Sequence, residues 1–178
     1  LTNDGRLYAT NYLKADSRNN VLLRASPDRG KSWGASLNVT KLTTRGEVRR
    51  WAFKIDNNGQ LLVGWVNKVG SGVSDVLLAT SIDQGQNWAT LAIEDETGKY
   101  PSAADHYDVA LAVDGTGVAT VAQMIWTDTR NVQTELFGQP LVLDSIPPTA
   151  PSNLQATGGD NSTLLTWDAS TDATGIQG

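Results

Sequence analysis

The feature that most constrains this fold is an eight-residue motif that occurs twice. Residues 26–33 and 81–88 both read S-x-D-x-G-x-x-W, and the second copy starts 55 residues after the first (26 to 81). Similar segments precede both copies: a turn with Gly5 or Gly59, an apolar stretch, a polar loop and a second apolar stretch. Spaced copies of one unit indicate a repeat array.

A third unit has its glycine-containing turn at residues 114–117 and lacks the motif. The alternation of apolar and polar residues, interrupted by Gly- and Asp/Asn-rich turns, predicts short antiparallel strands in every unit. The second unit is complete, with strands expected at 51–56, 60–66, 76–81 and 88–94. The first unit lacks its first strand. The strands of the third unit are expected at 107–114, 118–126 and 132–137.

Composition narrows the function classes. The net charge is −5 and no basic stripe is present, which argues against a nucleic-acid partner. No apolar run has the length of a membrane span. The chain has no cysteine and a single histidine, His106, which we interpret as a loop or packing residue. A two-histidine metal site is therefore excluded within the chain, and we expect neither a metal nor a cofactor.

Four-stranded antiparallel units of this length, repeated in tandem, predict an all-β fold: a β-propeller. We expect a partial propeller over residues 1–145, with blades at about 1–42, 43–95 and 106–143. This would be the C-terminal part of a six- or seven-bladed propeller, because closed propellers need at least about four blades. The remaining blades would come from a missing part of the chain or from another subunit.

The octapeptide resembles the Asp-box, the repeat of bacterial neuraminidases that is found in sialidases and other secreted β-propellers. Its aspartate can accept hydrogen bonds from its own turn, its glycine permits a positive φ, and its tryptophan can pack against the blade. We interpret these residues as a folding device, which the resemblance places on the face opposite the active site. They are Ser26, Asp28, Gly30, Trp33, Ser81, Asp83, Gly85 and Trp88.

The C-terminal segment has a different character. Residues 146–151 form a Pro-rich linker, and two strands are expected at 152–157 and 162–168 around a Gly-Gly-Asp-Asn turn. The pattern P-P-x-x-P-x-x-L-x-A-T followed by L-x-W-D resembles the opening of a fibronectin type III domain. On that resemblance, 152–178 is the N-terminal fragment of such a sandwich, and Leu154 and Trp167 are core positions.

Chemistry is expected on the propeller face opposite the octapeptides, where the loops between strands two and three and between blades lie. Sialidase-like chemistry needs arginines that clamp a carboxylate, a tyrosine nucleophile with a glutamate partner, and an aspartate acid/base. The arginine-clamp motif F-R-I-P is absent. The candidate catalytic residues are Arg45, Glu47, Arg49, Arg50, Tyr100 and Asp105, with Tyr107 as a second phenol. Asp128 and Arg130, in W-x-D-x-R, are expected to form a loop-holding pair.

These observations favour an extracellular or cell-surface module, secreted and of bacterial type, that binds or processes carbohydrate. The alternative is a non-catalytic surface-adhesion or structural, filament-forming propeller. Whether the chain is an enzyme stays open at this point; an enzyme would be a glycoside hydrolase of sialidase-like type.

Overall fold

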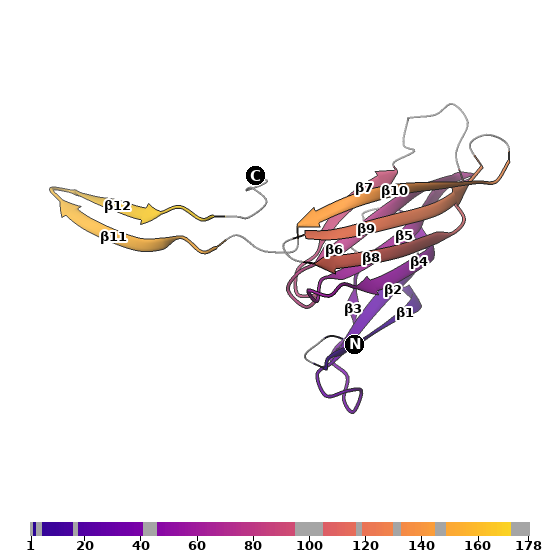
Figure 1. Ribbon diagram of the computed structural model, residues 1–178, viewed down its shortest axis with the longest axis horizontal. Helices are drawn as coiled ribbons and strands as arrows, with labels where there is room; N and C mark the ends of the chain where they lie inside the picture. The colour runs from indigo at the N-terminus through magenta and orange to yellow at the C-terminus, as the bar shows by residue number, and fades with distance from the viewer. Residues whose placement is uncertain are drawn as a thin grey trace.

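The computed structural model describes residues 2, 5–15, 18–40, 46–94, 105–116, 119–129, 133–144 and 149–171. Within these residues the chain is all-β and has no α-helix, as the turn-rich sequence predicts. Figure 1 shows three sheets stacked one against the next and a separate hairpin that extends away from them. Every described strand pairs antiparallel with a neighbour in sequence, so each sheet is a meander.

The strands divide into four groups. The first sheet has the order β1 (Leu7–Ala15), β2 (Arg18–Ser26), β3 (Leu37–Asn38). The second has the order β4 (Glu47–Ile55), β5 (Leu61–Gly70), β6 (Val73–Ser81), β7 (Ala89–Glu94). The third has the order β10 (Glu135–Asp144), β9 (Ala119–Asp128), β8 (Val109–Thr116). The hairpin consists of β11 (Ser152–Gly159) and β12 (Ser162–Asp168).

The four strands predicted for the second unit are confirmed, but the polar loop expected between its second and third strands is wrong. Strand β5 continues to Gly70 and β6 starts at Val73, so only two residues form the turn, with Gly72 at a φ of 66°. The polar residues Asn67 and Asp75 face each other across the ladder and are buried. The prediction was wrong because it took polar residues as a sign of an exposed loop, whereas Asn67 and Asp75 are buried within the strands.

The third unit has the three expected strands, but its last strand is longer than predicted. The expected strand ended at Phe137, whereas β10 runs to Asp144 and pairs with β9 along its whole length. Pro140 lies within β10, which is an edge strand in this sheet. An edge strand tolerates proline because the missing N–H has no ladder partner to lose.

The second sheet is buried on both faces. Alternate residues of β5 point to opposite sides, so Leu61, Val63 and Trp65 face the first sheet while Leu62 faces the third. Strand β4 contacts β2 on one side and β8 on the other. The seven residues Leu61–Asn67 are therefore all buried, although the segment is a single strand.

Two hydrophobic cores result from this stacking. The core between the first and second sheets contains Val21, Leu23, Val39, Val48, Leu61, Val63, Trp65, Leu77 and Ala79. The core between the second and third sheets contains Leu62, Val76, Leu78, Ile93, Leu111, Ala122, Met124, Trp126 and Leu141. A Cβ on Gly64 would lie 2.8 Å from the Met124 terminal methyl group, so glycine permits the close approach of these two sheets.

The first two units share a turn geometry as well as a sequence pattern. In the turn before β5, the Asp56 N–H donates to Gln60 O, and Asp56 Oδ1 accepts from Gln60 N–H at 2.7 Å. In the turn before β1, the N–H of Thr2 donates to Arg6 O, and Thr2 Oγ1 accepts from Arg6 N–H at 3.1 Å. The free oxygen of Asp56 accepts a hydrogen bond from the Thr120 hydroxyl, which ties this turn to β9.

The hairpin β11–β12 confirms the two strands predicted for the tail. Its side chains are all exposed, including Leu154 and Trp167, the two residues expected at core positions of a sandwich domain. Residues 145–148 and 172–178 lie outside the described part, so the proposed linker is described only from Thr149 onward.

We expect Trp65→Ala to lower the free energy of unfolding by about 3–5 kcal/mol, because it removes a fully buried indole from the first core. The matched control is Trp167→Ala in the hairpin, where the indole is exposed and the change should stay within about 0.5 kcal/mol. Urea unfolding of the full chain, followed by far-UV circular dichroism, measures both. Equal effects of the two substitutions would contradict the assignment of the core.

Candidate functional site

The sheets have two chemically different ends. We call the end that carries residues 56–60 and both octapeptides the turn end, since Ile55, Leu61 and Ser81 are register neighbours there. The opposite end, which we call the loop end, carries the start of β4, the β5–β6 turn, the start of β8 and the end of β9. Most of the candidate catalytic residues belong to the loop end.

At the turn end, both octapeptides have the same hydrogen bonds. Asp28 Oδ1 accepts from Ser26 Oγ at 2.9 Å and from the Ser32 N–H at 2.8 Å, while Oδ2 accepts from Ser32 Oγ at 2.6 Å. The N–H of Gly30 donates to Ser26 Oγ at 2.7 Å, and the glycine has a φ of 90°. Both carboxylate oxygens of Asp28 are therefore used by the loop itself.

The second octapeptide repeats this pattern. Asp83 Oδ1 accepts from Ser81 Oγ and from the Asn87 N–H, each at 2.8 Å, and Oδ2 accepts from Asn87 Nδ2 at 2.6 Å. The Gly85 N–H donates to Ser81 Oγ at 2.9 Å, with a φ of 89° at the glycine. These bonds favour the ionised carboxylate. The side-chain and backbone donors of Ser32 lower the pKa of Asp28, and the Asn87 backbone N–H contributes most to the lowered pKa of Asp83.

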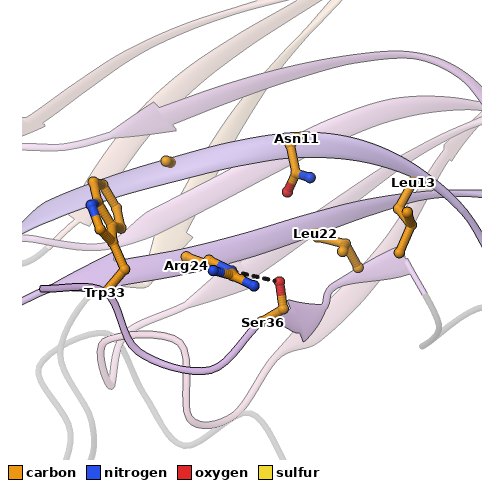
Figure 2. Close-up of a pocket in the computed structure, with 7 residues that line it drawn as sticks. Asn11, Leu13, Leu22, Arg24, Trp33 and Ser36 are labelled. Carbon is orange, nitrogen blue, oxygen red and sulfur yellow. Dashed lines mark hydrogen bonds between the residues drawn. The ribbon is translucent and has the colours of Figure 1, made fainter.

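The two octapeptide tryptophans differ in their surroundings. Trp88 packs against the first core, and its indole N–H donates to Gly85 O at 3.0 Å. Trp33 is exposed and lines a pocket on the outer face of the first sheet together with Arg24 and Asn11, with Arg24 as its labelled neighbour (Figure 2). The motif thus determines the turn in both copies, while the burial of its tryptophan depends on the presence of a neighbouring sheet.

The loop end has a network centred on Arg49, one of the candidate residues. Its Nη1 donates to Asp105 Oδ1 at 2.6 Å and to His106 O at 3.0 Å. The guanidinium carbon lies 5.0 Å from the centre of the Tyr107 ring, a cation–π distance. Arg49 on β4 thus holds the segment that leads into β8, and it joins the second sheet to the third.

Beneath this network lies a buried polar group. The His106 N–H donates to Ser74 Oγ at 2.6 Å, and His106 Nδ1 lies 2.6 Å from Ser74 O. Because a carbonyl oxygen only accepts, Nδ1 carries a proton. On the other side of the ring, Nε2 lies 3.6 Å from Asp128 Oδ2, and both side chains are fully buried. His106 therefore has the packing role that the sequence predicts, with a carboxylate as its neighbour.

A second group of loop-end side chains lies between the first and second sheets. The Tyr12 ring stacks on Trp51 with centroids 5.3 Å apart, and its hydroxyl donates to Val48 O at 2.7 Å. Burial raises the pKa of the Tyr12 phenol, and the Glu47 carboxylate adds to the increase. Glu47 also accepts a hydrogen bond from Asn19 Nδ2 at 3.3 Å. The Tyr12 phenol is thus neutral, and the side chain is exposed at the loop end.

Several sequence candidates are not brought together by the described structure. Arg50 forms an ion pair with Asp108, with 3.3 Å between Nε and Oδ1. Arg45, Tyr100 and Arg130 lie outside the described residues, so the Asp128–Arg130 pair stays a prediction. Asp128 faces His106. Sequence reasoning missed Ser74 and Asp108, and no motif marks either of them.

This arrangement is suited to binding. The two described candidate arginines, Arg49 and Arg50, each engage a carboxylate of the segment before β8. Among the described residues, no group of three His, Cys, Asp or Glu side chains is placed to hold a metal ion. A search of the same part of the chain finds no helix with the length and apolarity to cross a bilayer. The rings of Tyr107 and Tyr12 are exposed beside these charged side chains.

Comparison with protein-family models gives no match, and comparison with curated proteins gives none either.

We expect the octapeptide aspartates to make folding stability depend on pH in the acid range. Their pKa values are lowered by folding, so their contribution is present above the unfolded value near 3.8 and is lost as the pH falls through the lower folded value. Asp83→Asn should lose less stability than the wild type as the pH falls through this range. Thermal unfolding between pH 2 and pH 6 measures it, with exposed Asp160→Asn as control. An unchanged limb in Asp83→Asn would contradict the assignment.

We expect Arg49 and Asp105 to be coupled more strongly than Arg50 and Asp108. The first pair is 24% and 15% exposed and the second 64% and 71%, so solvent screens the second far more. A double-mutant cycle with alanine substitutions, read by urea unfolding, should give about 1.5–3 kcal/mol for the first pair and less than about 1 kcal/mol for the second. Raising the salt concentration should remove only the second coupling. Equal couplings would show that the first pair does not hold the sheets.

Proposed function

We propose that the three stacked sheets are consecutive blades of a β-propeller and that its loop end binds carbohydrate. The propeller assignment is supported by meander sheets that follow one another in sequence, by a central sheet buried on both faces, and by two octapeptides at the same end of successive sheets. The exposed hairpin β11–β12 would be the start of a fibronectin type III-like sandwich. Its expected core residues, Leu154 and Trp167, are exposed in the described structure.

The observation that carries the binding proposal is the Tyr107 ring. It is exposed, one of its faces is held by Arg49, and it stands between Asp105 and Asp108, which flank it in sequence. A sugar ring presents an apolar C–H face and a rim of hydroxyl groups. An aromatic plane with fixed carboxylates and a guanidinium nearby supplies a contact for each. Tyr12, exposed and stacked on Trp51 at the same end, adds a second aromatic surface.

Binding without catalysis is better supported than hydrolysis. An arginine clamp needs guanidinium groups that are open to a substrate carboxylate. Here Arg49 Nη1 is engaged at 2.6 Å by Asp105, so this nitrogen is not open to a substrate carboxylate. We therefore propose an extracellular module that binds carbohydrate. The alternative is a sialidase-like enzyme, which would hydrolyse a sialoside.

A surface-adhesion or structural role is the second candidate. It is favoured by the same ion pairs, because Arg49–Asp105 and Arg50–Asp108 both join β4 to the segment before β8. Such pairs hold successive sheets together without any ligand.

We expect the full chain to bind carbohydrates on a glycan array and Tyr107→Ala to weaken that binding at least about tenfold, because the stacking plane is lost. Tyr107→Phe keeps the ring and should retain most of the affinity. The matched control, Ile82→Ala, removes an exposed apolar side chain at the turn end and should change nothing.

Two results would contradict this proposal. Absence of binding to every glycan on the array would favour the structural role. Hydrolysis of a fluorogenic sialoside that is lost in Arg49→Ala would instead establish an enzyme. Circular dichroism of each variant confirms that the sheets remain folded.

A further inference from the structure

We infer that a single proton, kept between the buried side chains of His106 and Asp128, holds the joint between the second and third sheets at the loop end. By joint we mean the packed contact between two successive sheets. When the pH rises far enough to remove this proton, the joint loosens. The inference goes beyond the proposed function, because it concerns how the loop end is held together and not which ligand it binds.

Three fully buried polar side chains form this part of the joint. Ser74 lies on β6 of the second sheet, His106 lies in the segment before β8, and Asp128 ends β9 of the third sheet. Each has an exposed fraction of 0%. A polar group away from water costs free energy unless it is hydrogen-bonded, and a buried charge costs more unless it is paired. The protonation of this group therefore depends on how its atoms face one another.

One side of the His106 ring is fixed by Ser74. Nδ1 carries a proton and lies 2.6 Å from the Ser74 carbonyl oxygen, while the His106 backbone N–H donates to Ser74 Oγ at 2.6 Å. Because Nδ1 is protonated, it cannot take the proton of the Ser74 hydroxyl, 3.2 Å away. Ser74, His106 and Asp128 therefore do not act as a nucleophilic triad, despite their residue types. Their contacts join two sheets.

The other side of the ring faces a carboxylate. Nε2 of His106 lies 3.6 Å from Asp128 Oδ2. One proton on either atom makes the pair attractive, as imidazolium and carboxylate or as imidazole and carboxylic acid. Without that proton, the lone pair of Nε2 and a negatively charged oxygen face each other at the same distance. This repulsion is strong because a buried site screens charge poorly.

Other charged groups lie on the segments around the ring. They are Arg49 on β4, Lys68 on β5 opposite Ser74, Asp75 on β6, and Asp105 and Asp108 in the segment of the ring itself. Arg49 donates to Asp105 at 2.6 Å, which balances the charge of that carboxylate, and to the His106 carbonyl oxygen at 3.0 Å. Asp75 points to the opposite face of β6 from Ser74. Asp128 is thus the carboxylate that faces Nε2.

The direction of the pH effect follows from the number of bound protons. In an unfolded chain a histidine loses its imidazolium proton near about pH 6.5. The folded pair keeps the shared proton to higher pH, because its loss creates the repulsion between Nε2 and Oδ2. The folded protein then binds more protons than the unfolded chain. The contribution of the pair is therefore present below about pH 6.5 and is lost as the pH rises through the folded value.

The residue proposed to bind carbohydrate depends on this joint. Tyr107 follows His106 directly, and its backbone N–H donates to Thr127 O at 3.0 Å, next to Asp128. Arg49 contacts both the His106 carbonyl oxygen and the Tyr107 ring. A joint that loosens at high pH therefore also loosens the position of the aromatic ring.

The first experiment is a titration of the folded wild-type chain. His106 is the only histidine in the sequence, so isotope-labelled histidine gives the ring signals of this residue alone in an NMR spectrum. We expect the ring to titrate at higher pH in the folded chain than in the same chain unfolded in concentrated urea. A midpoint at the same or lower pH in the folded chain would overturn the inference.

Hydrogen exchange tests whether the joint opens. The His106 amide, which donates to Ser74 Oγ, should lose protection between about pH 6 and about pH 8.5. The matched control is the Gln60 amide at the turn end, which donates to Asp56 Oδ1 at 2.7 Å and should keep its protection. Unchanged protection of the His106 amide, or an equal loss at both amides, would show that the proton does not hold this joint.

The decisive variant is Asp128→Asn, because an amide can donate to Nε2 without any bound proton. Urea unfolding at about pH 6 and about pH 8.5 should show that the wild type loses stability over this range and that Asp128→Asn does not. Asp108→Asn, at a side chain that is 71% exposed, is the control and should behave as the wild type. The same loss in Asp128→Asn as in the wild type would contradict the inference. If Asp128→Asn does not fold, the wild-type titration decides.

A consequence for binding rests on the proposed function. Glycan affinity of the wild type should fall between about pH 6 and about pH 8.5, whereas that of Asp128→Asn should not. Absence of glycan binding at both pH values would contradict the proposed function only, because the ring titration and amide exchange do not use a glycan. Equal affinity of the wild type at both pH values would show that Tyr107 does not depend on the joint.

Discussion

The stack depends on the burial of both faces of strand β5. Leu61, Val63 and Trp65 enter one core and Leu62 enters the other, so one strand of ten residues contributes to both joints. A shift of one residue in the register would turn the residues of each face to the opposite face. The indole of Trp65 would then face the third sheet, where Gly64 now allows the Met124 side chain to approach closely. The register of the second sheet therefore determines the position of both neighbours.

The two ends of the strands differ in where their polar contacts come from. At the turn end, the octapeptide carboxylates are saturated by donors of their own loops, which makes them good turn formers and poor ligands. At the loop end, charges come from segments distant in sequence and meet across the joint between sheets, as Arg49 and Asp105 do. Aromatic side chains lie beside them, and the guanidinium carbon of Arg49 is 5.0 Å from the centre of the Tyr107 ring.

Local patterns predicted much of the fold because their physics is local. The strands of the second unit follow from period-two alternation, and the positive φ of Gly30 and Gly85 follows from the tight return of the chain. The same reasoning failed for residues 67–75, because strand propensity treats Asn67 and Asp75 as loop formers. In the structure both side chains are buried, and the ladder continues past them to Gly70 with one register shift between Lys68 and Gly70.

The sequence by itself determined the repeat, the strands and the shape of the octapeptide turns, since each depends on contacts within a few residues. Only the tertiary structure decided that Arg49 pairs with Asp105, 56 residues away, and that His106 faces Asp128. It also decided that two tryptophans in one motif have different environments, Trp88 packed and Trp33 exposed. The physical reason is that alternation specifies which side of a sheet a residue faces, whereas its partner depends on which sheet lies there.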